Sequence, residues 1–217
     1  TCVAHSRSEI EKILETLSQK KIENIVALRG DPPQGAADFQ APSDGFHHAS
    51  ELVRFIHQHP RYGQKFDLIV AGYPEGHPEC KDKKKDLAYL KQKVDEGANA
   101  VTTQLFFDNK DYFDFLSRAR KIGIRVPIVP GIMPVTHGPQ IQKFSQMCGA
   151  KIPEKIRQAI TRYGEDQNSI TAFGIEYATR QCEDLLRHGV PGLHFYTLNQ
   201  SLATRQIYLN LNLANAV

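Results

Sequence analysis

The sequence lacks several patterns that would assign it to a common class of protein. No apolar run approaches the roughly 18 residues that a membrane-spanning helix needs, and no signal peptide is visible. The cysteines are Cys2, Cys80, Cys148 and Cys182, and none lies in a CxxC or another metal-type spacing. These absences argue against a membrane protein and favour free thiols in a reducing cytosol, so we predict a cytoplasmic protein.

The chain also lacks a large excess of either charge. Lysine and arginine number 27 against 24 aspartate and glutamate residues, which gives a formal net charge of +3. The basic run at residues 81–85 is interpreted as a solvated entrance to a helix. We therefore expect no nucleic acid and no membrane among the partners.

What the sequence does contain is a series of short apolar runs, each followed by polar residues. Such runs are typical of buried strands in a parallel sheet. They span residues 25–28, 66–73, 100–107, 127–134 and 192–199, and they carry Asp31, Tyr73, Gln104, His137 and Asn199 at or after their C-terminal ends. Because α/β barrels place their chemistry at the C-terminal ends of the strands, we expect a ligand pocket there.

Helical periodicity fills the intervals between these runs. We predict that the first helix begins at Ser8, which forms a capping-box pattern with Glu11. Ser43 or Asp44 is expected to cap the second helix, and residues 202–211 are expected to form the last. The long loop between residues 31 and 44 is either functional or a plain surface excursion.

The alternation of strands and helices predicts a parallel α/β fold. A doubly wound sheet would usually carry GxGxxG after its first strand, and this sequence has none. A (β/α)8 TIM barrel needs eight strands and about 250 residues. We predict such a barrel as a single catalytic domain over residues 1–217, with its N-terminal β/α units absent, because the chain opens without Met and leads directly into a helix.

Some polar residues allow more than one interpretation. Gln104 lies inside a predicted strand, where an unpaired buried amide costs roughly 1–3 kcal/mol. It is either a structural amide bonded to the backbone or a ligand contact. The histidine pairs at residues 47–48 and 57–59 lack accompanying carboxylate or thiolate ligands, so we predict no metal. The Arg-Gly-Asp tripeptide at 29–31 is not interpreted as a cell-adhesion motif, because it ends a strand.

At these motifs the sequence resembles the methylenetetrahydrofolate reductase family over essentially its whole length. The shared motifs are Ala27-Leu-Arg-Gly-Asp31, Ala71-Gly-Tyr-Pro-Glu-Gly-His-Pro-Glu79, Thr103-Gln-Leu-Phe-Phe-Asp108, Ile128-Val-Pro-Gly-Ile-Met-Pro134 and His194-Phe-Tyr-Thr-Leu-Asn199. The resemblance implies a barrel that holds FAD. NADH or NADPH would reduce the flavin, which would then reduce 5,10-methylenetetrahydrofolate to 5-methyltetrahydrofolate in a ping-pong scheme of one-carbon metabolism. A homo-oligomer is expected.

The resemblance also assigns roles to residues of this chain. Flavin contacts of the family match Arg29, Gly30, Asp31, Ala49, Tyr73, His77, Asp86 and Lys93. Lys93 suits the pyrophosphate and Asp86 a ribose hydroxyl. Four further cofactor positions carry residues that differ from those usual in the family or in some of its members, and these are His48, Cys80, Tyr89 and Gln92.

Catalytic and substrate roles follow from the same resemblance. Asp31 matches an aspartate that approaches the folate and influences the flavin, and Gln104 matches a glutamine that meets folate and nicotinamide in turn. An amide can both donate and accept hydrogen bonds, which suits two different ligands. Substrate contacts also match Gln140, Phe144, Leu198 and Gln200, of which Gln200 replaces a common arginine.

The family's general acid is a glutamate on a strand that would precede this chain, and Glu75 and Glu79 do not match it. Two alternatives therefore stay open beside the reductase. One is a catalytically silent paralogue that binds flavin or folate, and the other is a different flavin barrel oxidoreductase, such as a relative of proline dehydrogenase.

Overall fold

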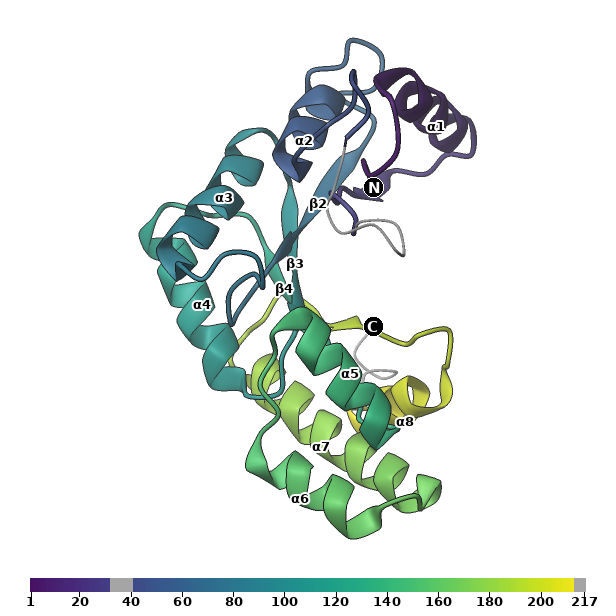
Figure 1. Cartoon of the computed structure of the whole chain (residues 1–217), viewed down its shortest axis with the longest axis vertical. Coiled ribbons are helices and arrows are strands. Elements are labelled where there is room, and N and C mark those ends of the chain that lie inside the picture. Colours follow the sequence, from purple (N-terminus) through teal and green to yellow (C-terminus); the bar gives the residue numbers. More distant parts are fainter. Residues whose placement is uncertain (32–40, 213–217) are drawn as a thin grey trace. The chain divides into compact units, whose positions relative to one another are not determined.

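Helices and strands alternate along the chain in the computed structural model, which describes residues 1–31 and 41–212 (Figure 1). The greater part of the predicted long loop, residues 32–40, lies outside this range. The elements are α1 (Arg7–Gln19), β1 (Asn24–Val26), α2 (Ala49–His57), β2 (Asp67–Gly72), α3 (Lys83–Asp95), β3 (Ala100–Leu105), α4 (Asn109–Lys121), β4 (Ile128–Ile132), α5 (Gly138–Cys148), α6 (Glu154–Tyr163), α7 (Gln167–Arg187), β5 (His194–Phe195) and α8 (Leu202–Asn210).

The strands form one sheet in the order β1-β2-β3-β4-β5. Pairing is parallel where β1 meets β2, with Asn24 opposite Asp67, and where β4 meets β5, with Gly131 opposite His194. A doubly wound sheet reverses its strand order at a switch point, whereas successive strands of a barrel are neighbours throughout. The predicted α/β class, with consecutive units of a barrel-type sheet, is confirmed.

Two of the predicted strands are shorter and more exposed than expected. β1 and β5 contain three and two residues, and Val26 is 46% exposed. Both strands lie at the ends of the strand order, so each has one strand neighbour in the sheet. The prediction that all five runs are fully buried was therefore wrong for these two.

The starts of the first two helices also differ from prediction. The capping box of α1 joins Ser6 and Glu9, because the Ser6 side chain accepts from the Glu9 amide while the Glu9 carboxylate accepts from the Ser6 amide at 2.7 Å. Two patterns with the same spacing overlap here, and Ser8 lies inside the first turn. α2 begins after His48, which makes no side-chain cap, so neither Ser43 nor Asp44 caps it.

Contacts between residues divide the chain into two compact units. The first unit comprises Thr1–Gly72, Leu87–Thr102 and Ala119–Pro127. The second comprises Tyr73–Asp86, Thr103–Arg118 and Ile128–Val217. The buried apolar residues of the first unit come from several elements, including α1, α2, β2 and α3, and among them are Ile10, Leu14, Leu52, Val53, Ile56, Leu68, Val70, Leu87 and Leu90.

The core of the second unit joins strand ends to the helices that follow them. Leu105, Phe107, Met133 and Val135 form one buried cluster with Ile141, Ile156, Ala159 and Ile170. Helices α6 and α7 lie side by side over this core (Figure 1). The close approach of α7 depends on Gly174, because a Cβ atom there would lie 1.7 Å from the Val135 carbonyl oxygen.

Within residues 1–31 and 41–212, no helix is both long and apolar enough to cross a membrane. Over the same residues, no group of three or more His, Cys, Asp or Glu side chains is placed to hold a metal ion.

Candidate functional site

The Arg29-Gly30-Asp31 turn follows β1 and is held by the first residues of the chain. The amides of Cys2 and Val3 donate to the Leu28 and Arg29 carbonyls at 3.0 and 2.8 Å. Gly30 has a φ of +90°, and a Cβ atom there would lie 2.6 Å from Val3 Cγ1. Only glycine fits this turn without strain. Asp31, at its end, is exposed.

The other predicted cofactor residues of the first unit lie on α2 and α3. Lys93 is half-buried, and its Nζ donates to the Ala71 carbonyl at 2.6 Å, which places its ammonium group at the C-terminal end of β2. Ala49 is the first residue of α2, and His48 precedes it with an exposed side chain. Tyr89 and Gln92 are exposed.

Four predicted cofactor residues of the second unit lie in the connection between β2 and α3 or in the first turn of α3. The rings of Tyr73 and His77 meet edge to face, with their centroids 4.5 Å apart. The His77 amide donates to Asp86 Oδ2 at 3.3 Å, and the Cys80 amide donates to the His77 carbonyl at 2.8 Å. The Cys80 thiol bonds to the Asp82 carbonyl at 3.4 Å. The loop is therefore ordered by its own side chains.

Gln104 lies on the face of β3 opposite to the helices of the second unit. Thr103 and Leu105 are buried, and Leu105 packs against the helix core, whereas Gln104 is half-buried between them. Its Oε1 accepts from the Leu105 amide at 2.9 Å. No bond of its Nε2 group is found among the described residues. The bond of Gln104 Oε1 matches the structural alternative, and the ligand contact stays a prediction.

A pocket of about 160 Å³ in the second unit brings together three of the predicted substrate residues, Gln140, Leu198 and Gln200. It opens between the segment after β4, the starts of α5 and α7, and the connection from β5 to α8. Its other lining residues are Met133, Pro134, Thr136, Ile141, Gln167, Thr171, Tyr196, Thr197, Leu202, Ala203 and Thr204.

The pocket is uncharged, since none of its lining residues is Asp, Glu, Lys, Arg or His. Its one phenol also stays neutral, because burial and the nearby Cys148 raise the pKa of Tyr196 to about 12. The Tyr196 hydroxyl donates to the Thr103 carbonyl at 2.8 Å. Phe144 does not line this pocket and packs instead against the apolar core.

Sequence reasoning missed the part of this pocket that α7 supplies. Gln167 is the first residue of α7, directly after the capping residue Asp166. Its Nε2 donates to the Thr136 carbonyl and to Thr171 Oγ1, the latter at 3.2 Å. Gln167 does not follow a strand, so the strand-end pattern could not indicate it. Its position directly after a helix-capping residue was a usable sequence signal.

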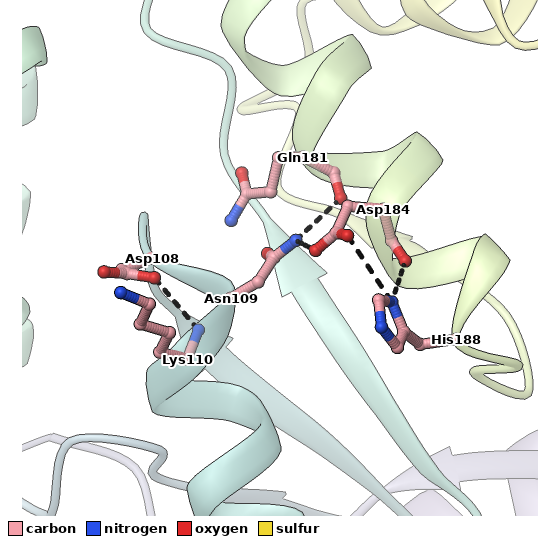
Figure 2. A network of polar contacts seen from close by, with 6 residues as sticks. All are labelled: Asp108, Asn109, Lys110, Gln181, Asp184 and His188. Atoms are coloured by element: carbon pink, nitrogen blue, oxygen red, sulfur yellow. Dashed lines mark hydrogen bonds and ion pairs between the residues drawn. The ribbon is translucent and has the colours of Figure 1, made fainter.

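Polar residues that follow strands also occupy positions away from this pocket, and His137 and Asn199, two of the strand-end residues predicted to meet a ligand, do not line it. Asn109, at the start of α4, donates through Nδ2 to the Gln181 carbonyl at 3.0 Å and to Asp184 Oδ2 at 2.7 Å (Figure 2). These bonds fasten α4 to α7, and His188 extends the network through its 2.8 Å contact with the Asp184 carbonyl. His137 caps α5, and Asn199 lies in a turn with a φ of +60°.

Comparisons with known proteins agree with one another. The model of a family described as "Methylenetetrahydrofolate reductase" matches residues 1–212. "Methylenetetrahydrofolate reductase (NADH) 1" of Arabidopsis thaliana is 39% identical over 222 residues, which cover 98% of this chain and 37% of the relative. "Probable methylenetetrahydrofolate reductase (NADPH)" of Caenorhabditis elegans is 36% identical over 98% of this chain and 32% of its own length.

A bacterial relative and a solved structure extend the comparison. "5,10-methylenetetrahydrofolate reductase" of Pectobacterium carotovorum is 38% identical over 93% of this chain and 64% of its own length. The fold is also similar to a structure described as an uncharacterized protein from Clostridium thermocellum that binds two copies of 5-methyl-5,6,7,8-tetrahydrofolic acid. The TM-score is 0.57 at 16% identity, over 100% of this chain and 72% of the other.

Proposed function

Because the chain belongs to the methylenetetrahydrofolate reductase family, we propose that it contributes most of a site at which NADH or NADPH reduces 5,10-methylenetetrahydrofolate to 5-methyltetrahydrofolate. The observation that carries the proposal is the uncharged pocket, which gathers three predicted substrate residues from α5 and from the connection between β5 and α8. The chain spans about 37% of the length of the Arabidopsis relative, so the activity of the whole protein is part of the proposal. A homo-oligomer is proposed from the family resemblance, and a cytoplasmic location from the spacing of the four cysteines.

The proposed cofactor is FAD, and the residues present suit it chemically. The ammonium group of the half-buried residue Lys93 can pair with a diphosphate, and the Asp86 carboxylate can accept from a ribose hydroxyl. The Tyr73–His77 ring pair offers an aromatic surface, and Gly30 allows the turn after β1 to adopt its positive φ without strain. When bound, FAD supplies hydride transfer between the nicotinamide and the folate.

The protein groups orient the substrates and exclude charge from part of their binding site. The amides of Gln140 and Gln200, with the hydroxyls around them, can donate and accept hydrogen bonds without attracting an ion. Such a pocket suits an aromatic ring that bears an amide, which both nicotinamide and the benzoyl part of folate provide. Gln104 Nε2 is proposed to contact each substrate in turn.

Asp31 is proposed as an anchor for the folate ring system and not as the proton donor. The methylene group accepts hydride after its bridge opens, and that opening requires a general acid at a ring nitrogen. Asp31 is exposed at the end of its turn, where a carboxylate can accept hydrogen bonds from the pterin. Asp31→Asn should therefore raise the KM for the folate. The fold-change in that KM should exceed the fold-change in the rate of flavin reduction by the nicotinamide.

The test is to purify the natural full-length protein, to measure its flavin content, and to follow the formation of 5-methyltetrahydrofolate from 5,10-methylenetetrahydrofolate and either nicotinamide. We expect a yellow protein with turnover that depends on the folate. A protein that takes up no FAD on titration would refute the flavin assignment. One that binds FAD without turning over the folate would favour the silent paralogue.

A further inference from the structure

Glu75 lies in the β2–α3 connection between two proposed cofactor residues, Tyr73 and His77, but it has no role in the site described so far. Both of its carboxylate oxygens lie 3.1 Å from the backbone nitrogen of Lys151. Lys151 follows the end of α5, which terminates at the left-handed residue Gly149. A half-buried carboxylate thus joins the cofactor loop to the end of α5.

One further approach brings the loop and the end of α5 together, and a separate bond joins the loop to α4. Gly149 faces the loop closely, because a Cβ atom there would lie 3.6 Å from Pro78 Cγ. On the other side of Glu75, Arg118 Nη2 donates to the Pro74 carbonyl at 3.3 Å. Glu75 therefore bonds the middle of the loop to the segment that directly follows α5.

Burial makes ionisation of the Glu75 side chain less favourable in the folded protein. Burial raises the pKa of Glu75, the Lys151 amide lowers it, and the charged groups that act on it are Asp111, which raises it, and Lys151 and Lys83, which lower it. Since the net effect is a raised pKa, the ionised form is less favourable in the folded protein than in the unfolded chain. A glutamine would accept from the same amide without that penalty.

We propose that Glu75 is a positioning residue that couples the cofactor loop, Tyr73–Cys80, to α5, the helix that carries Gln140 and Phe144. The inference rests on the proposed function, because the cofactor and substrate roles of these segments belong to it. A ligand that orders the loop fixes the end of α5 through Glu75, and a ligand that orders α5 fixes the loop in return. Such coupling is reciprocal, so folate should tighten FAD binding and FAD should tighten folate binding.

The experiment measures the dissociation constant of FAD for the full-length protein by fluorescence quenching, with and without saturating folic acid, which has no methylene bridge to reduce. In the wild type, folic acid should tighten FAD binding by about fivefold or more, the lower end of typical coupling between sites. Glu75→Ala should lose this effect. Glu75→Gln should retain it, because its amide oxygen can still accept from Lys151.

Control variants distinguish a loss of coupling between FAD and folate binding from a loss of folding. Glu165→Ala, which removes an exposed glutamate between α6 and α7, should behave as the wild type. Glu75→Asp keeps the charge but shortens the side chain, and it should lose the coupling even if Glu75→Ala does not fold. The melting temperature of each apoprotein, measured without ligands, shows whether the substitution destabilises the fold.

Each outcome decides one of the two claims. If the wild type binds no FAD, the proposed function fails. If it binds FAD but folic acid has no effect, or if Glu75→Asp keeps the full effect, the inference about Glu75 fails while the proposed function stands. Loss of coupling in Glu75→Asp without a matching fall in the melting temperature supports the inference.

Discussion

Replacing Lys93 by Met should weaken FAD binding strongly while leaving the fold intact. The ammonium group lies at the C-terminal end of β2, 2.6 Å from the Ala71 carbonyl, and its side chain is half-buried. Methionine keeps most of the apolar stem but removes the charge. A hydrogen bond to a charged group contributes roughly 1.5–3 kcal/mol. That loss corresponds to an increase of roughly 10- to 150-fold in the dissociation constant of FAD.

Lys91 on the same helix provides the matched control. It pairs with Asp95 at the next turn, in an exposed ion pair of the kind that contributes about 0.3–0.5 kcal/mol. Lys91→Met removes the same charge from α3 and should change FAD affinity by less than about threefold. Equilibrium titration of the full-length apoprotein with FAD measures both variants. Equal effects of the two substitutions would show that the net charge of the helix matters and that the position of Lys93 does not.

Three further predictions concern other parts of the chain. Gln104→Ala should slow both flavin reduction by the nicotinamide and flavin reoxidation by the folate in stopped-flow measurements, and unchanged rates would leave only the structural role of its bond to the Leu105 amide. Tyr112→Phe removes a buried donor 2.7 Å from the Ile128 carbonyl and should lower the free energy of unfolding by about 1–3 kcal/mol in urea titrations; no loss would mean that water reaches that carbonyl. Because the pKa of Glu75 is raised above its ordinary value of 4.5, its contribution to stability is present below that pH and is lost as the pH rises through the folded-state pKa. Glu75→Gln should flatten this part of the curve of unfolding free energy against pH, and an unchanged slope would refute the burial argument.

The alternation of apolar runs and helical stripes was enough to predict the α/β class and the five strands. It did not fix the ends of the sheet, because the periodicity of a run does not show whether a strand has neighbours on both sides. The predicted start of the first helix was wrong for a local reason. Ser6–Glu9 and Ser8–Glu11 have the same capping pattern two residues apart, and the structure uses the first.

Site residues that follow strands could be predicted from the sequence. Site residues that tertiary packing brings to the pocket from a distant helix could not. The strand-end pattern and the family resemblance led to Gln104, Gln140, Leu198 and Gln200, and the pocket gathers the last three. Gln167 reaches the same pocket from a helix far along the sequence, which only tertiary packing brings there. Asn109, the first residue of α4, is polar for a structural reason, because its side chain bonds α4 to α7.

The central claim is that this chain belongs to a site at which one flavin accepts hydride from a nicotinamide and gives it to a folate. The most direct measurement records the flavin absorbance of the full-length protein without oxygen, first on adding NADH or NADPH and then on adding 5,10-methylenetetrahydrofolate. The absorbance should fall with one of the nicotinamides and return with the folate, with 5-methyltetrahydrofolate formed in equal amount. Flavin that is reduced by the nicotinamide but is not reoxidised by the folate would contradict the account.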